Sequence, residues 1–472
     1  MAGTTESQSY ILLQNGTIIT HTPPRNPNDP YTTTILRSHS LLIEGSHIAS
    51  IAPTISPPSP STRIIDCTNK LIAPGFIDTH HHLWQTQLKG RHADEMFLDY
   101  MATGNAQSGS YTEQDVFWGE LGGCMESLDA GVTSWDPFEM DPEYMPKWLF
   151  TQLSDLAKAQ PFGDGRVRLG FAFDGLFLPK EMVVDLFDKV RDMGVKLITT
   201  HYVNSKNPIV NAPSPVTLLA SYGLLRPDIL FSHANELLPS ETALLDQHGG
   251  SISTTPNTEL QMNFGFPACF RQDAYSHASL GIDCHSCGSA DIITQMRLAL
   301  QSERARYNQA FLDQGKNPKV PNVSAEQAYN LGTILGARAV GMEKEIGSLA
   351  VGKLADVVVF DATSPSMICA AEQDPVAAIV LHASVRDVEM VIVDGVFRKE
   401  GGKTLPVSVE REVAGLGGGE RKVDVGWEGV VKELLKSREG IEEKIAKLDS
   451  GKVREGIIGM MHIDESNIVD SL

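Results

Sequence analysis

Short apolar runs alternate with stretches of helical periodicity from about residue 71 to 340. Apolar runs that end in polar residues are typical of buried parallel strands, and an apolar residue every three to four positions is typical of amphipathic helices. The predicted strands include RVRLGFAFDGL, VKLITTHYV, DILFSHANE, GSISTTPNTE and SLGIDCHS. This alternation predicts an α/β fold, a parallel (β/α)8 TIM barrel, whose functional residues would lie at the C-terminal ends of the strands.

Both ends of the chain carry a different pattern, that of short antiparallel strands. Residues 10–60 contain two apolar segments in which Asn15-Gly16 and Gly45-Ser46 predict hairpin turns. Residues 346–400 return to this pattern, with Asp394-Gly395 as a third hairpin signal. The simplest arrangement joins the two ends in one small β module beside the barrel.

The last part of the chain has a helical pattern. GWEGVVKELLKSREGIEEKIAKL repeats apolar residues at helical spacing, with Glu and Lys on the other face. We therefore expect a composite β module from residues 1–68 and 345–410, a barrel from 69–344, and a helical C-terminal extension over 411–472.

Composition narrows the classes of partner. The 472 residues carry a formal net charge of -20 and no basic stripe, which argues against nucleic acid. No apolar run is long enough to span a bilayer, and the first residues lack a signal-peptide pattern. We expect a cytoplasmic protein with a small-molecule substrate and with neither nucleic acid nor membrane as a partner.

Cysteine is sparse, with six residues scattered along the chain, as is usual in a reducing compartment. Cys284 and Cys287 form a C-x-x-C pair, but a zinc knuckle would need a second such pair, and the sequence has none. A redox pair is an alternative that the sequence supports little better. We interpret the two cysteines as small residues lining the end of a strand.

Three consecutive histidines follow the apolar run that ends in Asp78-Thr79. Side chains alternate along a strand, so His80 and His82 face one side and His81 the other. Two imidazoles on one side supply half of a tetrahedral zinc site. The alternative is a polar strand end whose histidines are satisfied by hydrogen bonds.

Three more predicted strands end in residues of the same chemistry. His201 ends LITTH, His233 ends ILFSH, and Asp283 ends SLGID. A carboxylate at a buried strand end needs a partner, because its desolvation is costly. Together these strand ends predict a metal site at the mouth of the barrel.

The ordered motifs APGFIDTHHH, ITTHYV, SHANEL, SLGID and EIGSLAVGKLADVVVFD resemble those of the amidohydrolase superfamily, and within it the cytosine-deaminase and chlorohydrolase-like branch. The resemblance runs from about residue 10 to 400. It implies a distorted (β/α)8 barrel with a β-sandwich built from both chain ends, and often a homo-oligomer, a dimer or larger. By the family pattern, His80, His82, His201 and Asp283 are metal ligands and His233 is a catalytic residue.

Some members hold two metals bridged by a carboxylated lysine on the fourth strand. The corresponding segment, VRLGFAFDGL, offers no lysine at its end, so we expect one divalent metal per chain, with zinc ahead of iron. A divalent metal lowers the pKa of bound water towards neutrality. Asp283 would accept the water proton and deliver it to the leaving group, and His233 would stabilise charge on the substrate oxygen.

One position departs from the branch. Its deaminases carry H-x-x-E after the fifth strand, where the Glu protonates a ring nitrogen, but this chain reads HYVN, with Asn204 in that place. Glu259, which we assign as a catalytic candidate, or Glu236 could compensate. Either could instead be a helix-start carboxylate or a buried partner.

The surrounding sequence suggests a partly aromatic pocket for a planar, neutral substrate. Gln85 stands where guanine deaminase has a purine contact, and His285 lies two residues beyond Asp283. The substrate-binding candidates are Trp84, Gln85, Tyr202, Asn204, Glu236, Gln261, Phe264 and His285.

The sequence therefore predicts a mononuclear metal-dependent hydrolase of a C–N bond in an amide, lactam, imine or amidine. One alternative is a purine- or pyrimidine-type deaminase, which the missing Glu weakens. Another is non-hydrolytic chemistry at the same site, namely dehydration, isomerisation or decarboxylation. A non-catalytic scaffold would be expected to lose metal ligands, and here all four are present.

Overall fold

The computed structural model describes residues 9–23, 31–135, 147–202, 213–461 and 463–469. Its centre is a parallel five-stranded sheet ordered β13-β12-β11-β10-β9. The strands are β9 (Phe171–Ala172), β10 (Ile198–Tyr202), β11 (Ile229–His233), β12 (Ser251–Thr254) and β13 (Ala278–Leu280). Two more parallel pairs are β6 (Phe76–Asp78) with β8 (Val132–Trp135), and β7 (His81–His82) with β14 (Asp283–Cys284). The predicted α/β class is confirmed, but within the described ranges these strands form three hydrogen-bonded groups rather than one closed ring.

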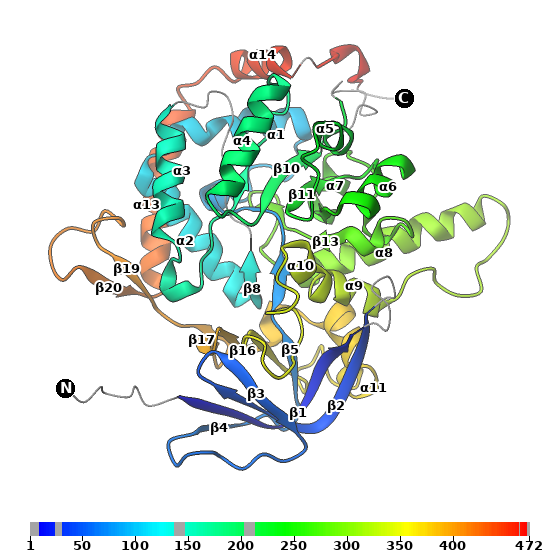
Figure 1. Ribbon diagram of the computed structural model, residues 1–472, viewed down its shortest axis with the longest axis vertical. Helices are drawn as coiled ribbons and strands as arrows, with labels where there is room; N and C mark the ends of the chain where they lie inside the picture. Colours follow the sequence, from blue (N-terminus) through cyan, green and yellow to red (C-terminus); the bar gives the residue numbers. More distant parts are fainter. Residues whose placement is uncertain (1–8, 24–30, 136–146, 203–212, 462, 470–472) are drawn as a thin grey trace.

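Helices follow most of these strands and surround them (Figure 1). They are α2 (Glu113–Asp129), α3 (Lys147–Ala159), α4 (Lys180–Asp192), α5 (Pro215–Tyr222), α6 (Pro239–His248), α7 (Pro256–Gln261), α8 (Ile292–Leu312), α9 (Ala325–Leu331) and α10 (Ile334–Ala339). Local sequence sets their ends. Thr112 and Asp115 form a reciprocal capping box at the start of α2, and Gly194, at φ 85°, follows the end of α4. The apolar strand residues pack against the inner helix faces in one continuous core.

Strands from both chain ends form one nine-stranded sheet at the lower end of the molecule (Figure 1). Its strands are β1 (Tyr10–Thr22), β2 (Thr32–Glu44), β3 (His47–Ala52), β4 (Arg63–Asp66), β5 (Lys70–Pro74), β15 (Val357–Asp361), β16 (Val388–Val393), β17 (Val396–Glu400) and β18 (Lys403–Thr404). The antiparallel pairing of β5 with β15 joins the two ends.

Two of the three predicted hairpin turns occur. Gly45-Ser46 connects β2 to β3, and Asp394-Gly395, both with positive φ, connects β16 to β17. The prediction at Asn15-Gly16 was wrong, because β1 runs through this pair without reversing. Asn15 takes φ 63° at a register shift, so the same two residues form a bulge. A Cβ on Gly16 would lie 2.5 Å from Ile72 Cδ1, so a larger residue would require the Ile72 side chain to shift.

The C-terminal extension contains the expected helices, α13 (Trp427–Ile445) and α14 (Ser450–Met460). They are preceded by a hairpin of β19 (Val407–Glu410) and β20 (Lys422–Val425), so the prediction of a purely helical extension was wrong. These strands have only four residues each, too few for a clear alternating pattern. α13 packs on α2, and α14 packs on α1 (Phe97–Thr103).

None of the helices in the described ranges combines the length and the apolar character that a membrane-crossing segment requires.

Candidate metal centre and active site

Four histidines converge at the C-terminal ends of the parallel strands. The His80 ring lies 4.9 Å from His82, 5.0 Å from His201 and 5.5 Å from His233, centroid to centroid. His201 lies 5.6 Å from His233 and is stacked on it. These residues are separated by up to 153 positions in sequence, from 80 to 233, and meet because each directly ends or follows a parallel strand.

Asp283 completes the cluster. Its Oδ1 lies 3.1 Å from His82 Nε2 and 3.3 Å from His80 Nε2, and its Oδ2 lies 3.9 Å from His233 Nε2. Burial raises the pKa of this carboxyl, but the surrounding imidazoles outweigh that effect and hold the pKa well below its usual range. Asp283 is therefore a buried carboxylate facing three histidines.

The backbone is strained at two of these residues. Asp283 has φ 68° and His233 has φ 74°, in the left-handed region that non-glycine residues rarely occupy. Such a conformation costs on the order of 1–3 kcal/mol per residue and persists where the surrounding structure enforces it. Here it turns both side chains towards the cluster.

The donor set fits a divalent metal. Two groups of three side chains, His80 with His82 and His201, and His80 with His233 and Asp283, each bring their donor atoms within 4.8 Å of one another. Imidazole nitrogens and a carboxylate oxygen are the ligands of a catalytic zinc site. His80 Nδ1 is hydrogen-bonded to Ser232 Oγ at 2.9 Å, whereas His80 Nε2, buried in the cluster, has no well-aligned hydrogen bond to any described residue. Burial lowers the pKa of His80 to about 4, so it stays in the neutral form that binds metals.

Asp174, just beyond β9, orients His201. Its carboxylate accepts hydrogen bonds from His201 Nδ1 at 2.7 Å, from the His201 backbone N–H at 2.8 Å and from Thr200 Oγ1 at 3.1 Å. A histidine whose Nδ1 carries the proton presents Nε2 as the lone-pair donor. Asp174 was not predicted, because only a lysine was considered at this strand end. The argument that a buried strand-end carboxylate needs a partner, used for Asp283, applies to Asp174 as well.

His233 is supported from behind by Glu259. His233 Nδ1 is hydrogen-bonded to Thr255 Oγ1 at 2.9 Å and lies 3.7 Å from Glu259 Oε1. Glu259 is fully buried and accepts from the Thr255 backbone N–H at 2.7 Å and from Asn235 Nδ2 at 2.9 Å. Glu259 thus has the features of both alternatives to a catalytic role, because it is buried behind His233 and also lies in the first turn of α7. Glu236 lies exposed beyond β11, and Asn204 lies outside the described residues.

His81 faces away from the cluster, as strand alternation predicted. Its Nδ1 lies 2.7 Å from Asp78 Oδ2, and its ring lies 4.7 Å from that of His285. His285 is fully buried, with Nε2 hydrogen-bonded to Glu126 at 3.0 Å. The expectation that His285 lines the substrate pocket was wrong, because the positive φ of Asp283 breaks the two-residue periodicity on which it rested.

The side-chain amide of Gln85 is likewise hydrogen-bonded within the protein. Its amide nitrogen donates to Tyr100 Oη at 2.7 Å, and its oxygen accepts from Ser286 Oγ at 3.1 Å. Its side chain is fully buried, which leaves the expected purine contact without support.

The other pocket candidates divide into two kinds. Phe264 lies 5.3 Å from the His233 ring and 5.2 Å from Phe97, which places an aromatic wall beside the cluster. Tyr202 donates its hydroxyl to Glu241 at 2.8 Å, and Gln261 donates to the backbone oxygens of residues 92 and 95, so both hold other elements in place. Trp84 packs edge-on against Tyr111 at 5.1 Å.

Glu120 of α2 is a half-buried acid that was not predicted from the sequence. Burial raises its pKa to about 8, although His82 and the Trp84 backbone N–H act in the opposite direction. It sits in the middle of an unremarkable helical pattern, so the sequence carried no signal for it.

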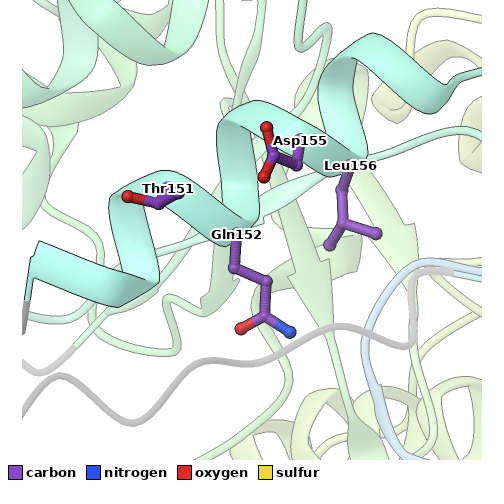
Figure 2. Close-up of a pocket in the computed structure, with 4 residues that line it drawn as sticks. All are labelled: Thr151, Gln152, Asp155 and Leu156. Carbon is purple, nitrogen blue, oxygen red and sulfur yellow. The ribbon is translucent and has the colours of Figure 1, made fainter.

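A separate hollow of about 590 Å³ lies along α3 (Figure 2). It is lined by Thr151, Gln152, Asp155 and Leu156, which project from one helix, and none of them belongs to the histidine cluster. Its four described lining residues include no metal-binding group of the kind found at the strand ends.

Comparisons with known proteins agree with this site. A family model described as Amidohydrolase family matches residues 178–398. The zinc-bound adenosine deaminase of Xanthomonas campestris superposes with a TM-score of 0.75 at 16% identity, covering 92% of this chain and 98% of that one. The chain thus resembles the amidohydrolase family in sequence over residues 178–398 and this deaminase in fold over most of its length. The predicted resemblance is thereby confirmed.

Two further proteins are similar to this chain. A 5'-deoxyadenosine deaminase of Methanobrevibacter smithii is 26% identical over 411 residues, covering 79% of this chain and 90% of the relative. The atrazine chlorohydrolase of Arthrobacter aurescens, in complex with zinc, superposes with a TM-score of 0.70 at 17% identity, covering 91% of this chain and 100% of that one. The chain thus resembles both deaminases and a chlorohydrolase, the two kinds of enzyme in the branch that its motifs indicated.

Proposed function

We propose that this protein is an amidohydrolase that uses water to cleave a C–N bond in a small cyclic or aromatic substrate. The observation that carries the proposal is the single buried cluster in which Asp283 lies 3.1 and 3.3 Å from the Nε2 atoms of His82 and His80. A carboxylate among neutral imidazoles is the set of groups required to hold a divalent metal and to move a proton beside it.

One divalent metal per chain, zinc rather than iron, is held by His80, His82, His201 and Asp283. When bound, it supplies Lewis acidity that makes water nucleophilic near neutral pH. A second, bridged metal would need a carboxylated lysine at the end of β9, and Asp174 stands there, bound to His201.

Asp283 and His233 have different roles in the reaction. Asp283 accepts the proton of the attacking water and hands it to the leaving nitrogen. His233 is held at Nδ1 by the Thr255 hydroxyl, turns Nε2 towards Asp283, and stabilises the substrate atom that gains negative charge. Glu259 fixes this arrangement through the Thr255 backbone N–H.

Aminopurine nucleosides are the first substrates to test. The wall of Phe264 and Phe97 beside His233 suits a planar ring, and the relatives named above include deaminases of adenosine-type compounds. The bond broken would then be that between the ring carbon and its exocyclic amine.

Hydrolysis of a cyclic amide or lactam is the second candidate. Asn204 occupies the place where deaminases of this branch carry the ring-protonating Glu, and amide hydrolysis requires no such protonation. Dehydration, isomerisation or decarboxylation at the same site is distinguished by the absence of solvent oxygen in the product.

The remaining parts of the proposal concern the whole molecule. The parallel strands form a distorted barrel spanning residues 69–344, and residues 1–68 with 345–410 form the β-sandwich domain. Residues 411–472 are an extension that covers α1 and α2. The amidohydrolase acts in the cytoplasm as a homo-oligomer on small molecules, with neither nucleic acid nor membrane as a partner.

The test begins with metal content per chain, measured by elemental mass spectrometry on protein purified without chelators. The metal-loaded protein is then assayed for ammonia release from adenosine, 5'-deoxyadenosine and guanine, and for ring opening of cyclic amides, in water enriched in oxygen-18. The Asp283→Asn variant, prepared identically, controls for contaminating hydrolases. Protein that takes up no metal after reloading, or a product without solvent oxygen, contradicts the proposal.

A further inference from the structure

Cys284 and Cys287 lie in a tight turn that directly follows Asp283. The Cys287 backbone N–H donates to the Cys284 carbonyl oxygen at 3.0 Å, which closes a four-residue turn. In such a turn the first and last Cα atoms are within about 7 Å, which is inside the range that a disulfide can bridge without moving the backbone. The backbone is therefore already folded as a disulfide between these cysteines would require.

The two thiols also meet. Cys287 packs against the small cluster formed by Tyr100, Met262 and Cys284, and Ser286 Oγ lies 3.8 Å from the Cys287 sulfur. Cys284 is almost fully buried, whereas Cys287 is partly exposed. An oxidant can therefore reach the Cys287 thiol, and the Cys284 thiol lies behind it in the protein interior.

The local environment favours reaction at Cys287. The hydrogen bond from Cys284 lowers the pKa of the Cys287 thiol, although partial burial acts the other way. A larger thiolate fraction and exposure to solvent are the two properties that make a cysteine reactive. The two cysteines were interpreted as small residues at a strand end. Their thiols also have the properties of a reactive pair.

We propose that Cys284 and Cys287 form a reversible oxidation site that responds to hydrogen peroxide and lies beside the metal cluster. The peroxide oxygen is transferred to the Cys287 sulfur, which becomes a sulfenic acid, and one water leaves. The Cys284 sulfur then attacks the Cys287 sulfur, a second water leaves, and the disulfide forms. Two thiols and one peroxide thus give one disulfide and two waters, and two electrons pass from sulfur to the peroxide.

The disulfide would act on the cluster through β14. Cys284 pairs with His82, and Asp283 with His81, in the two-stranded ladder of β14 and β7. Bond formation draws the two sulfurs to about 2.05 Å from each other, and it moves the Cys284 sulfur to which Tyr100 is hydrogen-bonded. The displacement begins at the residue next to Asp283, so we expect oxidation to lower metal affinity and turnover, an effect that rests on the proposed function.

The site itself is tested without any substrate. Zinc-loaded protein is treated with hydrogen peroxide, and its free thiols are titrated, its intact mass measured and its peptides mapped. We expect two thiols to disappear, the mass to fall by about 2 Da for the two hydrogens lost, and one peptide to contain a Cys284–Cys287 bond. Cys369→Ser, which removes an exposed cysteine outside the turn, should behave like the wild type. Persistence of both thiols, or a bond to any other cysteine, overturns the proposal.

The consequence for activity is a second measurement. Peroxide should reduce turnover by at least about tenfold, as changes next to metal ligands commonly do, and dithiothreitol should restore it. Cys287→Ser should keep its activity in peroxide. If the wild type and Cys287→Ser lose activity equally, the link to the cluster is wrong. If no hydrolase activity exists at all, the thiol and mass results still decide whether the oxidation site is present.

Discussion

Asp174→Asn tests how the cluster is held together. Asp174 accepts from His201 Nδ1 at 2.7 Å and from the His201 backbone N–H at 2.8 Å. In the variant, the amide oxygen can still accept from the backbone, but the amide NH₂ then faces Nδ1 and is itself a donor. Nδ1 must become the acceptor, and the ring proton moves to Nε2, which removes the lone pair that a metal would use.

The expected loss follows from this change of tautomer. Partners of metal-bound histidines contribute about 10- to 100-fold to metal affinity, or roughly 1.4–2.8 kcal/mol. Zinc affinity is measured by competition with a chromophoric chelator, and turnover at saturating zinc is measured beside it. Asp228→Asn is the matched control, because Asp228 pairs with Arg191 at 2.7 Å and touches no member of the cluster. Equal zinc affinity in Asp174→Asn and Asp228→Asn would refute the reasoning.

Three further predictions address catalysis and stability. Asp283→Asn should retain the far-ultraviolet circular dichroism of the wild type and lose at least about 100-fold in turnover, because the amide cannot accept a proton; near-normal turnover would remove Asp283 from its assigned role. His21 is hydrogen-bonded to Asn330 at 3.1 Å, and burial lowers its pKa from 6.5 to about 3. As the pH falls, the His21 imidazole is therefore protonated in the unfolded chain before it is protonated in the folded one. The free energy of unfolding should decline by about 1.4 kcal/mol per pH unit below pH 6.5. His21→Gln should reduce that slope in urea melts between pH 7.5 and 5. Lys399→Met should lower the free energy of unfolding by about 1–3 kcal/mol, because the buried ammonium donates to the Asp129 carbonyl and lies 2.8 Å from its carboxylate; an unchanged denaturation midpoint would show that this contact adds nothing.

The candidate site was predictable from sequence where one strand alone decides the outcome. His80 and His82 face the cluster and His81 faces away, because alternation along a strand is a property of the local backbone. His201, His233 and Asp283 could be grouped because parallel strands end at the same edge. These residues could be predicted without knowledge of how the helices pack.

Prediction failed where the local rule was interrupted or where the partner came from another element. The positive φ at Asp283 ends the alternation, so His285 packs against His81 and Glu126 instead of lining the pocket. Asn15-Gly16 has the composition of a turn, but strands on both sides of β1 hold the chain extended, and the pair becomes a bulge.

The sequence by itself determined the class of fold, the two-ended β module and the four chemistry-bearing strand ends, because periodicity and residue type are properties of each segment. Tertiary structure alone decided which groups support the cluster. Asp174 orients His201, which lies 27 residues later in the sequence, and Glu259 lies behind His233. Glu120 lies near His82. Such contacts depend on the packing of elements distant in sequence, and the free energy of a buried charge depends on every group around it. No local pattern carries that information.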